Sequence, residues 1–319
     1  MILAGLLDAE RPSIFNTASP EAEKIGAVGN GFLIAATAMF LLVAFLTVYI
    51  CVRYRAKADS PEPKQTSGNR KVEITMVGIP LLMVIFFFFW SMKTMSAVLP
   101  PRPAHATPDI IITGHQYWWQ ADYPAGKFST ANEIHLPVGR KLLVELRGAD
   151  VIHDWWVPAL GEKMDMIPGT SNYLWMTITK PGTYLGSCSE FCGEQHAWMR
   201  ITVIAQQPEA YQSWLAGQAA TGQLPADTMA ARGAALFMHA SCSSCHSIRG
   251  TTAIGTNGPD LTHFAGRQTM LTGMLKVSNE NIYRWLLDPQ KVKPGAHMPR
   301  FIFPRDSLLA LTAYLSSLK

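Results

Sequence analysis

Residues 188–199 read CSEFCGEQHAWM, and this stretch decides the fold of the middle of the chain. Cys188 and Cys192 are four residues apart, His196 follows four residues later, and Met199 lies three residues beyond it. Thiolate, imidazole and thioether together favour copper, whereas zinc sites make little use of methionine. Because a mononuclear blue-copper site uses one thiolate, the two cysteines predict two metal ions bridged by both sulfurs.

A second imidazole has to come from another part of the same domain. His153 lies in VIHDWW, residues 151–156, which is 35 residues before Cys188 and is typical of a neighbouring strand. Two copper ions that share thiolates suit electron transfer better than substrate turnover, because sharing keeps geometric change on reduction small. The alternatives are a disulfide with an incidental histidine and methionine, or a zinc site.

The sequence around this stretch reads as strands and turns from residue 109 to about residue 205. Runs rich in β-branched and aromatic residues lie at 110–112, 141–146, 173–178 and 200–204. Turn motifs separate them: PVG at 137–139 and PG at 168–169 and at 181–182. Short strands at this spacing predict an antiparallel sandwich or barrel.

Two long apolar runs precede this all-β part. Residues 27–51 carry no charge, and residues 74–92 include FFFFW and carry none either. About 20 apolar residues cross the hydrocarbon core as a helix, so we predict spans at 27–52 and 73–98. The alternative is a pair of buried core helices. Cys51, at the end of the first span, is predicted to be a small apolar filler.

The loop between the spans, 53–72, sets the orientation. Its charged residues are six basic and two acidic: Arg53, Arg55, Lys57, Lys64, Arg70 and Lys71 against Asp59 and Glu62. Excess Lys and Arg stay on the cytoplasmic side. We therefore expect segment 1–26 and everything after residue 98 outside a bacterial plasma membrane. The opening segment Met1–Leu7 lacks a basic start and is short for a signal peptide, which leaves a processed N-terminus open.

The copper loop, the run VIHDWWVPALG at 151–161 and GHQ at 114–116 resemble subunit II of cytochrome c oxidase. The resemblance covers about residues 25–205, including the two spans. It implies a cupredoxin barrel over residues 99–207 that holds the binuclear copper centre called CuA. The implied ligands are two bridging thiolates, one imidazole for each copper, a weak thioether and a backbone carbonyl: Cys188, Cys192, His153, His196, Met199 and Glu190.

The same resemblance implies roles for three further places. The Glu190 side chain would hold a magnesium ion shared with the catalytic subunit; the alternative is a solvated carboxylate. Glu73 would lie at the mouth of a proton path, or else be an interfacial acid beside Lys71. The aromatic run Tyr117-Trp118-Trp119 matches a cluster over the copper that serves electron transfer, although the family often begins it with Trp; the alternative is simple packing.

Residues 242–246 read CSSCH, the attachment signature of c-type haem. Cys242 and Cys245 would reach the two vinyl groups, and His246 would be the proximal ligand. The surrounding part, 229–319, has helical periodicity at 230–239, 280–287 and 306–318, as expected for an all-α class I cytochrome c. A redox disulfide, the alternative, would need a βαβ pattern that this sequence lacks.

The distal haem ligand is expected on a Pro- and Gly-containing loop. Met298 in GAHMP, residues 295–299, lies 52 residues past His246 and would raise the haem potential, as a donor to an oxidase requires. Its rivals are Met270, Met274, His263 and His297. Trp285 and Tyr283 are predicted to line the haem pocket or its core.

Charge is distributed unevenly between the two exported parts. Residues 102–200 hold 8 basic and 10 acidic side chains, and residues 229–319 hold 10 basic and 4 acidic. Joined by an Ala- and Gly-rich helical linker at 208–228, the two parts are expected to dock electrostatically. A net charge of +4 without a basic block interleaved with aromatics excludes nucleic acid as a partner.

The whole chain resembles the cytochrome-c-fused subunit II of a caa-type haem–copper oxidase. That implies electrons from an external cytochrome or quinol-oxidising complex passing through haem c and CuA to catalytic subunit I, which reduces dioxygen to water and pumps protons. The implied partners are subunit I, other oxidase subunits and membrane lipid. The alternatives are the CuA subunit of a nitric oxide reductase, or a membrane-tethered redox carrier with no catalytic partner.

Overall fold

The structure, a computed structural model, describes residues 12–56, 58–62, 64–65, 67–99, 101, 106–222, 225 and 227–319. The opening segment Met1–Leu7 and Lys57 of the predicted cytoplasmic loop lie outside the described residues. The chain divides into two compact units, Glu23–Pro100 and the remainder, which are treated separately below.

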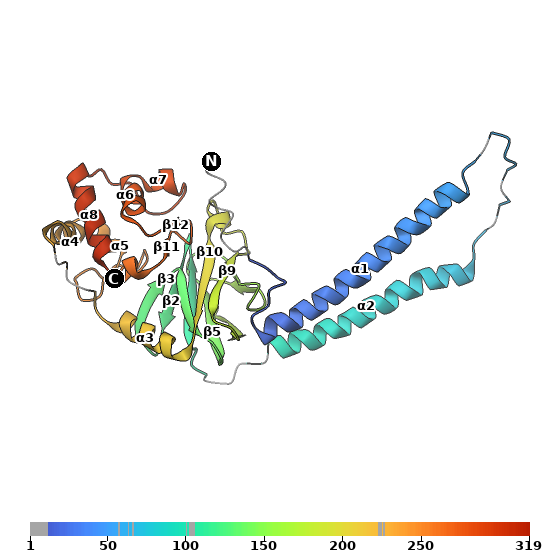
Figure 1. The fold of residues 1–319 in the computed structure, drawn as a ribbon, viewed down its shortest axis with the longest axis horizontal. Helices are drawn as coiled ribbons and strands as arrows, with labels where there is room; N and C mark the ends of the chain where they lie inside the picture. The colour runs from blue at the N-terminus through green and yellow to red at the C-terminus, as the bar shows by residue number, and fades with distance from the viewer. Residues whose placement is uncertain are drawn as a thin grey trace. The chain divides into compact units, whose positions relative to one another are not determined.

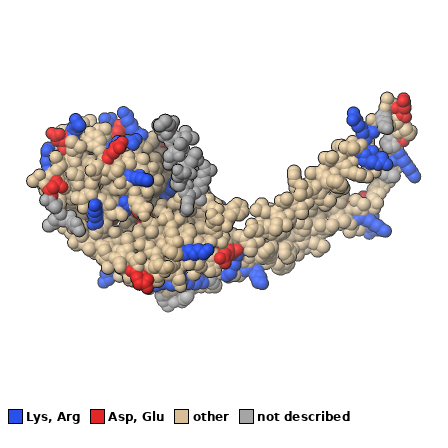
Figure 2. Space-filling model, viewed as in Figure 1, with Lys and Arg blue, Asp and Glu red and all other residues tan. Residues whose placement is uncertain are grey.

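The first unit is a hairpin of two long helices, α1 (Pro20–Arg53) and α2 (Arg70–Val98) (Figure 1). The most apolar 18-residue windows have mean hydropathies of 2.5 and 2.4, and none of their residues is buried. Helices this apolar and this exposed need lipid around them, as predicted for two spans. Figure 2 shows the basic side chains gathered at the loop end of the hairpin and few along its length. Cys51 is exposed on α1.

The second unit begins with a sandwich of two five-stranded sheets, called the β domain here (Figure 1). The first sheet has the order β3-β2-β1-β5-β8, with bounds Phe128–Ala131, Trp118–Tyr123, Ile110–His115, Lys141–Gly148 and Asn172–Thr177. The second has the order β4-β10-β9-β6-β7, with bounds Glu133–Pro137, Arg200–Gln206, Gly182–Cys188, His153–Trp156 and Met164–Met166.

The core of the β domain forms because alternate residues of its strands face inward. In β1 and β2 every second side chain is buried, which places Ile110, Ile112, Trp119 and Ala121 in one apolar cluster. The predicted all-β domain is therefore confirmed. The expectation of purely antiparallel pairing is wrong, because β1 pairs with β5 and β4 pairs with β10 in parallel. In each parallel pair the connection passes through strands or loops elsewhere in the sandwich, as parallel pairing requires.

Helix α3 (Pro208–Ala219) lies within the predicted linker and packs on the β domain. Tyr211 belongs to the apolar core of that domain, and Trp214 stacks on His135 with ring centroids 4.1 Å apart. The first half of the linker is thus bound to the sandwich, and only the residues after α3 bridge to the next domain.

The C-terminal part, Thr228–Lys319, is called the helical domain. Its elements are α4 (Thr228–His239), α5 (Cys242–Cys245), η3 (Phe264–Gly266), the short strands β11 (Thr269–Met270) and β12 (Leu275–Lys276), α6 (Asn279–Leu287), α7 (Pro289–Val292) and α8 (Arg305–Ser317). Asp227 and Ser278 cap α4 and α6 by accepting hydrogen bonds from backbone amides of the first turn. Phe237 of α4 packs against Tyr314 of α8 at 5.8 Å, which closes the core.

Candidate metal and haem sites

The candidate copper site lies where two neighbouring strands end. Cys188 is the last residue of β9, and His153 is the first residue of β6, which pairs with β9 so that Trp155 faces Cys188. The chain then turns back through the 3₁₀ helix η2 (His196–Trp198) into β10. Ordinary antiparallel pairing thereby brings together residues that are 35 positions apart.

The six predicted ligand groups meet at this corner of the sandwich. The two sulfurs of Cys188 and Cys192 lie 3.8 Å apart. The other separations are 4.0 Å from Cys188 Sγ to His153 Nδ1, 3.2 Å from Cys188 Sγ to the Glu190 carbonyl oxygen, 3.8 Å from Cys192 Sγ to His196 Nδ1, and 3.7 Å from Cys192 Sγ to Met199 Sδ. Each of the two sulfurs therefore has one imidazole nitrogen and one weak donor close to it.

The surroundings of the sulfur pair are suited to soft metal ions. Cys188, Cys192, His153 and Met199 are buried. Hydrogen bonding with Cys192 lowers the pKa of Cys188 to about 3, and the same contact raises the pKa of Cys192. One thiol therefore ionises readily and the other holds the proton that a metal would displace. This donor set fits a two-copper centre.

Asp150 orients the buried imidazole. Its Oδ1 lies 2.8 Å from His153 Nε2, which leaves Nδ1 facing the sulfurs. Burial alone would raise the pKa of Asp150, but hydrogen bonds from His153 and from the backbone amides of Gln116 and Val151 bring it to about 2. A carboxylate behind a ligating histidine fixes its tautomer and orientation. Asp150 was not predicted as a site residue; an acidic residue only three positions before a proposed histidine ligand could have indicated it.

Gln116 and Gly114, both in the GHQ run, support the site from the neighbouring sheet. The Gln116 side-chain amide donates to the Cys192 carbonyl oxygen at 2.7 Å and so holds the loop between the two cysteines. A Cβ on Gly114 would lie 2.9 Å from the His153 ring, so only glycine permits this approach.

The aromatic run divides between two environments. Trp119 is fully buried, lies 6.1 Å from His153 and donates from Nε1 to the Arg200 carbonyl oxygen. Trp118 stacks on His115 at 4.2 Å. The Tyr117 hydroxyl accepts from the Glu194 amide at 3.1 Å, and both Tyr117 and Trp118 line a cavity of the helical domain.

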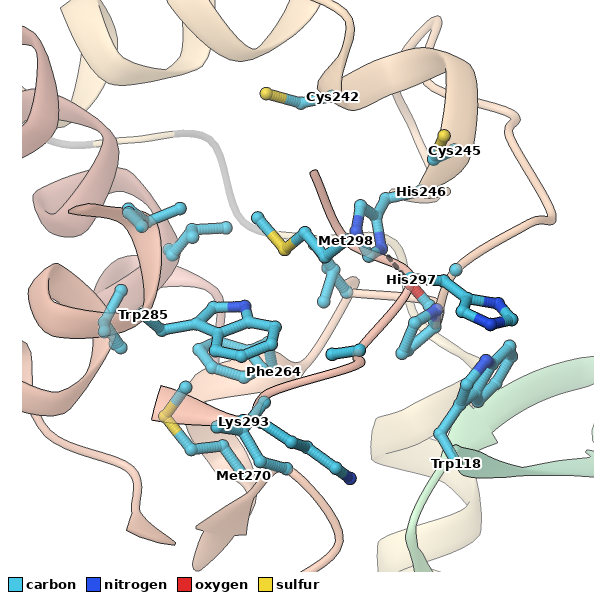
Figure 3. A pocket seen from close by; sticks show the side chains of 18 of the residues that line it. Trp118, Cys242, Cys245, His246, Phe264, Met270, Trp285, Lys293, His297 and Met298 are labelled. Atoms are coloured by element: carbon cyan, nitrogen blue, oxygen red, sulfur yellow. Dashed lines mark hydrogen bonds between the residues drawn. The ribbon is translucent and has the colours of Figure 1, made fainter. Parts of the chain in front are cut away.

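That cavity, of about 740 Å³, is the candidate haem site. Figure 3 shows Cys242, Cys245, His246, Trp285 and Met298 around one hollow. The volume is within the usual range of ligand pockets, roughly 300–1,000 Å³. Trp285 lines the cavity as predicted, and Tyr283 is not among its lining residues in the described part of the chain.

His246 is held ready to bind a metal. Its Nδ1 donates to the Pro259 carbonyl oxygen at 2.8 Å, and burial lowers its pKa, so the neutral ring keeps a lone pair on Nε2. A Cβ on Gly258 would lie 2.5 Å from His246 Cε1, so this packing requires glycine. The cavity, the two cysteines and the oriented imidazole fit a covalently attached haem.

The rivals for the distal position separate by their contacts. Both ring nitrogens of His263 are engaged, at 2.9 Å with the Lys319 carbonyl oxygen and at 3.1 Å with that of Ala220. Met274 is not among the residues that line the cavity, within the described chain. Three candidates do line it: Met298, Met270 and His297.

The two acidic residues singled out by resemblance lie in different settings. Glu190 is exposed on the copper loop. Glu73 accepts a hydrogen bond from the Asn69 amide at 3.1 Å, while Asn69 caps the amides of Lys71 and Val72. Glu73 thus satisfies the backbone amide of the N-cap residue at the start of α2.

Three family models match consecutive parts of the chain. They are the transmembrane domain of cytochrome c oxidase subunit II at residues 12–94, the periplasmic domain of the same subunit at 125–206, and cytochrome c at 230–319. The three together cover most of the hairpin, the β domain from residue 125 onward and most of the helical domain.

Relatives that match most or all of the chain are cytochrome c oxidase subunits 2. The chain is 35% identical to cytochrome c oxidase subunit 2 of Alkalihalophilus pseudofirmus, over all of this chain and 94% of that protein. It is 30% identical to cytochrome c oxidase subunit 2 of a Bacillus species, strain PS3, over 84% of this chain and 80% of that protein. Among solved structures, the periplasmic domain of subunit II of cytochrome oxidase from Bradyrhizobium japonicum matches at 35% identity with a TM-score of 0.34, over 35% of this chain and 95% of that one.

Proposed function

The chain belongs to the cytochrome c oxidase subunit II family, with a cytochrome c domain at its C-terminal end, and from that premise we propose which residues carry its electron transfer. It is an electron-transfer subunit of a haem–copper terminal oxidase. The nitric oxide reductase subunit and the free carrier are not favoured, because the matched relatives are oxidase subunits.

We propose that Cys188 and Cys192 bridge the two coppers of CuA, with His153 and His196 as terminal ligands. Met199 and the Glu190 carbonyl oxygen complete the two sets of donors. The observation that carries this proposal is that two sulfurs 3.8 Å apart each have one imidazole nitrogen and one weak donor within 4.0 Å. In the helical domain, Cys242 and Cys245 attach haem c, and His246 and Met298 bind its iron.

When bound, haem c and CuA each carry one electron at a time, and protein side chains pack between them. Tyr117 lines the cavity and accepts a hydrogen bond from the Glu194 amide of the copper loop, Trp118 lines the cavity beside it, and the Trp119 ring lies against His153. We propose that electrons reach the copper through this aromatic contact. Elemental analysis and an absorption spectrum of the purified complex test the assignment: besides the one copper of the haem–copper site in subunit I, two coppers and one haem c are expected for each copy of this chain, and a single further copper would contradict it.

The remaining assignments concern the assembled oxidase. Subunit II associates with subunit I in this family, and its redox domains lie outside the membrane. We propose a caa-type oxidase of a bacterial plasma membrane, fed by an external cytochrome or quinol-oxidising complex, with domain boundaries near residues 99, 208 and 229. The exposed Glu190 carboxylate is proposed to hold magnesium with subunit I, and Glu73 to stand at a proton entrance.

Replacing Asp150 with alanine is expected to weaken copper binding by about 10–100-fold, because the carboxylate orients His153. Copper titration against a competing chelator measures this. Asp122→Ala is the matched control: its carboxylate accepts hydrogen bonds from Gln120 and Ser129 and contacts none of the proposed ligands. Equal copper affinity in the two variants would show that Asp150 does not orient a ligand.

Replacing Met298 with alanine is expected to keep the covalent haem but lower its reduction potential, because a thioether ligand favours ferrous iron. A redox titration and the sulfur-to-iron charge-transfer band measure the change. Met274→Ala, outside the cavity lining, is the control. If Met298→Ala left both signals unchanged, Met270 or His297 would be the ligand.

A further inference from the structure

The contact between the β domain and the helical domain contains two buried side chains of opposite charge. Glu133, the first residue of β4, is 4% exposed, and Lys293, just after α7, is 3% exposed. Removing a charge from water is costly unless hydrogen bonds compensate for the lost hydration. Each of these two side chains finds partners on the other domain.

Glu133 of the β domain is satisfied by the start of β11. Its Oε1 accepts from the Thr269 amide and from the Thr269 hydroxyl, both at 2.7 Å, and its Oε2 accepts from the Gln268 amide at 3.0 Å. Next to it, Arg267 donates to the Thr130 hydroxyl at 3.3 Å. Three hydrogen bonds to one carboxylate define a single register between the two domains.

Lys293 makes the reciprocal contact. Its ammonium donates to the Tyr117 carbonyl oxygen at 3.1 Å and to the Thr272 hydroxyl at 3.0 Å. That hydroxyl donates in turn to the Trp198 carbonyl oxygen at 2.5 Å, within η2 of the copper loop. Burial lowers the pKa of Lys293 to about 8, so the side chain remains mostly charged at neutral pH.

The segment that starts at Lys293 also carries Met298. Along it, Gln195 of the copper loop donates to the Pro294 carbonyl oxygen, and the His297 ring meets Tyr117 edge-on at 5.7 Å. The β domain therefore holds the same short segment that the helical domain uses for its distal ligand. It also supplies one wall of the cavity, through Gln116, Tyr117 and Trp118.

We propose that Glu133 and Lys293 are positioning residues that hold the helical domain on the β domain in one fixed register, so that the two do not separate between electron transfers. Transient redox encounters use small, wet contacts with charges at the rim, whereas these two charges are buried and hydrogen-bonded. This deepens the proposed function, on which it rests for the identity of the haem and copper. External donors would then deliver electrons to the docked helical domain.

Hydrogen exchange of the purified complex tests the register. In Glu133→Gln the backbone amides of Gln268 and Thr269 are expected to exchange on the order of tenfold faster, because one charge-assisted acceptor is lost. Glu145→Gln is the matched control, since Glu145 is equally buried and its hydrogen bonds go to side chains of the β domain itself, among them Arg147 and Ser171. Unchanged exchange at the two amides in Glu133→Gln would overturn the role of Glu133.

Electron transfer after photoreduction of the haem tests whether the domains stay together. The haem-to-copper rate is expected to stay constant between about 0.01 M and 1 M salt, although the Debye length falls from roughly 30 Å to 3 Å, and in added glycerol. In Lys293→Met the haem-to-copper rate should fall at least severalfold and become sensitive to salt and to glycerol. Lys291→Met is the control, because Lys291 is exposed and only two residues away, and its rate should match that of the wild type.

A wild-type rate that falls with salt or viscosity would mean that the domains dissociate, and would overturn the fixed register. Failure of the proposed function would look different. In that case copper would receive no electron from the haem, while the exchange difference between Glu133→Gln and Glu145→Gln persisted.

Discussion

Cys188→Ser is expected to eliminate the binuclear copper centre and with it the oxidase activity. Cys188 Sγ lies 3.8 Å from Cys192 Sγ and 4.0 Å from His153 Nδ1, and it would be one of the two bridging thiolates of the proposed centre. A hard hydroxyl cannot replace a bridging thiolate toward copper. After the one copper of the haem–copper site in subunit I is subtracted, elemental analysis of the purified complex should fall from two coppers to one or none, and the near-infrared absorption of the centre should disappear.

Cys51→Ser is the control for this variant, because Cys51 is exposed on α1 and lies outside the β domain. It should keep both coppers and full turnover. Two coppers with an unchanged spectrum in Cys188→Ser would refute the proposed ligand set, since the remaining donors cannot supply two thiolate bridges.

Replacing Cys242 and Cys245 together with alanine is expected to remove the covalent haem and to cut turnover with the physiological donor by about 10²-fold. The reason is that a tethered donor acts at a high effective concentration, which adds on the order of 10²–10⁴ to an untethered contact. Small mediators should still reduce the copper, because its proposed ligands are untouched. Haem staining of a denaturing gel and steady-state oxygen consumption measure the two effects.

Ser244→Ala, between the two cysteines and exposed, is the matched control and should keep the haem. Near-normal turnover in the haem-free variant would show that the β domain takes electrons directly from a soluble donor. Tyr117 at the start of the aromatic run argues for the expected loss, since its ring is covered by the helical domain.

Local motifs made much of the candidate sites predictable. Cys188, Cys192, His196 and Met199 lie within 12 consecutive residues, so the sequence alone predicts that their side chains are close together. Strands β1, β5, β8 and β10 were predicted because their buried positions carry β-branched or aromatic residues. Strand β6 was predicted only through the spacing of His153, and β9 was not predicted, since HDWW and GTYLGSC carry site residues and small residues in place of that pattern.

Long-range contacts that no motif marks could not be predicted. Parallel pairing of β1 with β5 depends on how the sheets pack and leaves no local signal. Glu133 and Lys293 read as ordinary surface charges, because Glu and Lys are almost always solvated. The count of 10 basic and 4 acidic residues predicted a loose electrostatic attraction, whereas the domains meet through two buried, hydrogen-bonded charges.

The central claim is that electrons entering this chain at haem c leave it through CuA, and one time-resolved measurement tests it most directly. The haem of the purified complex is photoreduced, and the haem band and the near-infrared copper band are followed together. We predict that the haem is reoxidised and the copper reduced with one shared rate constant and equal numbers of electrons. Reoxidation of the haem without matching reduction of the copper would contradict the claim.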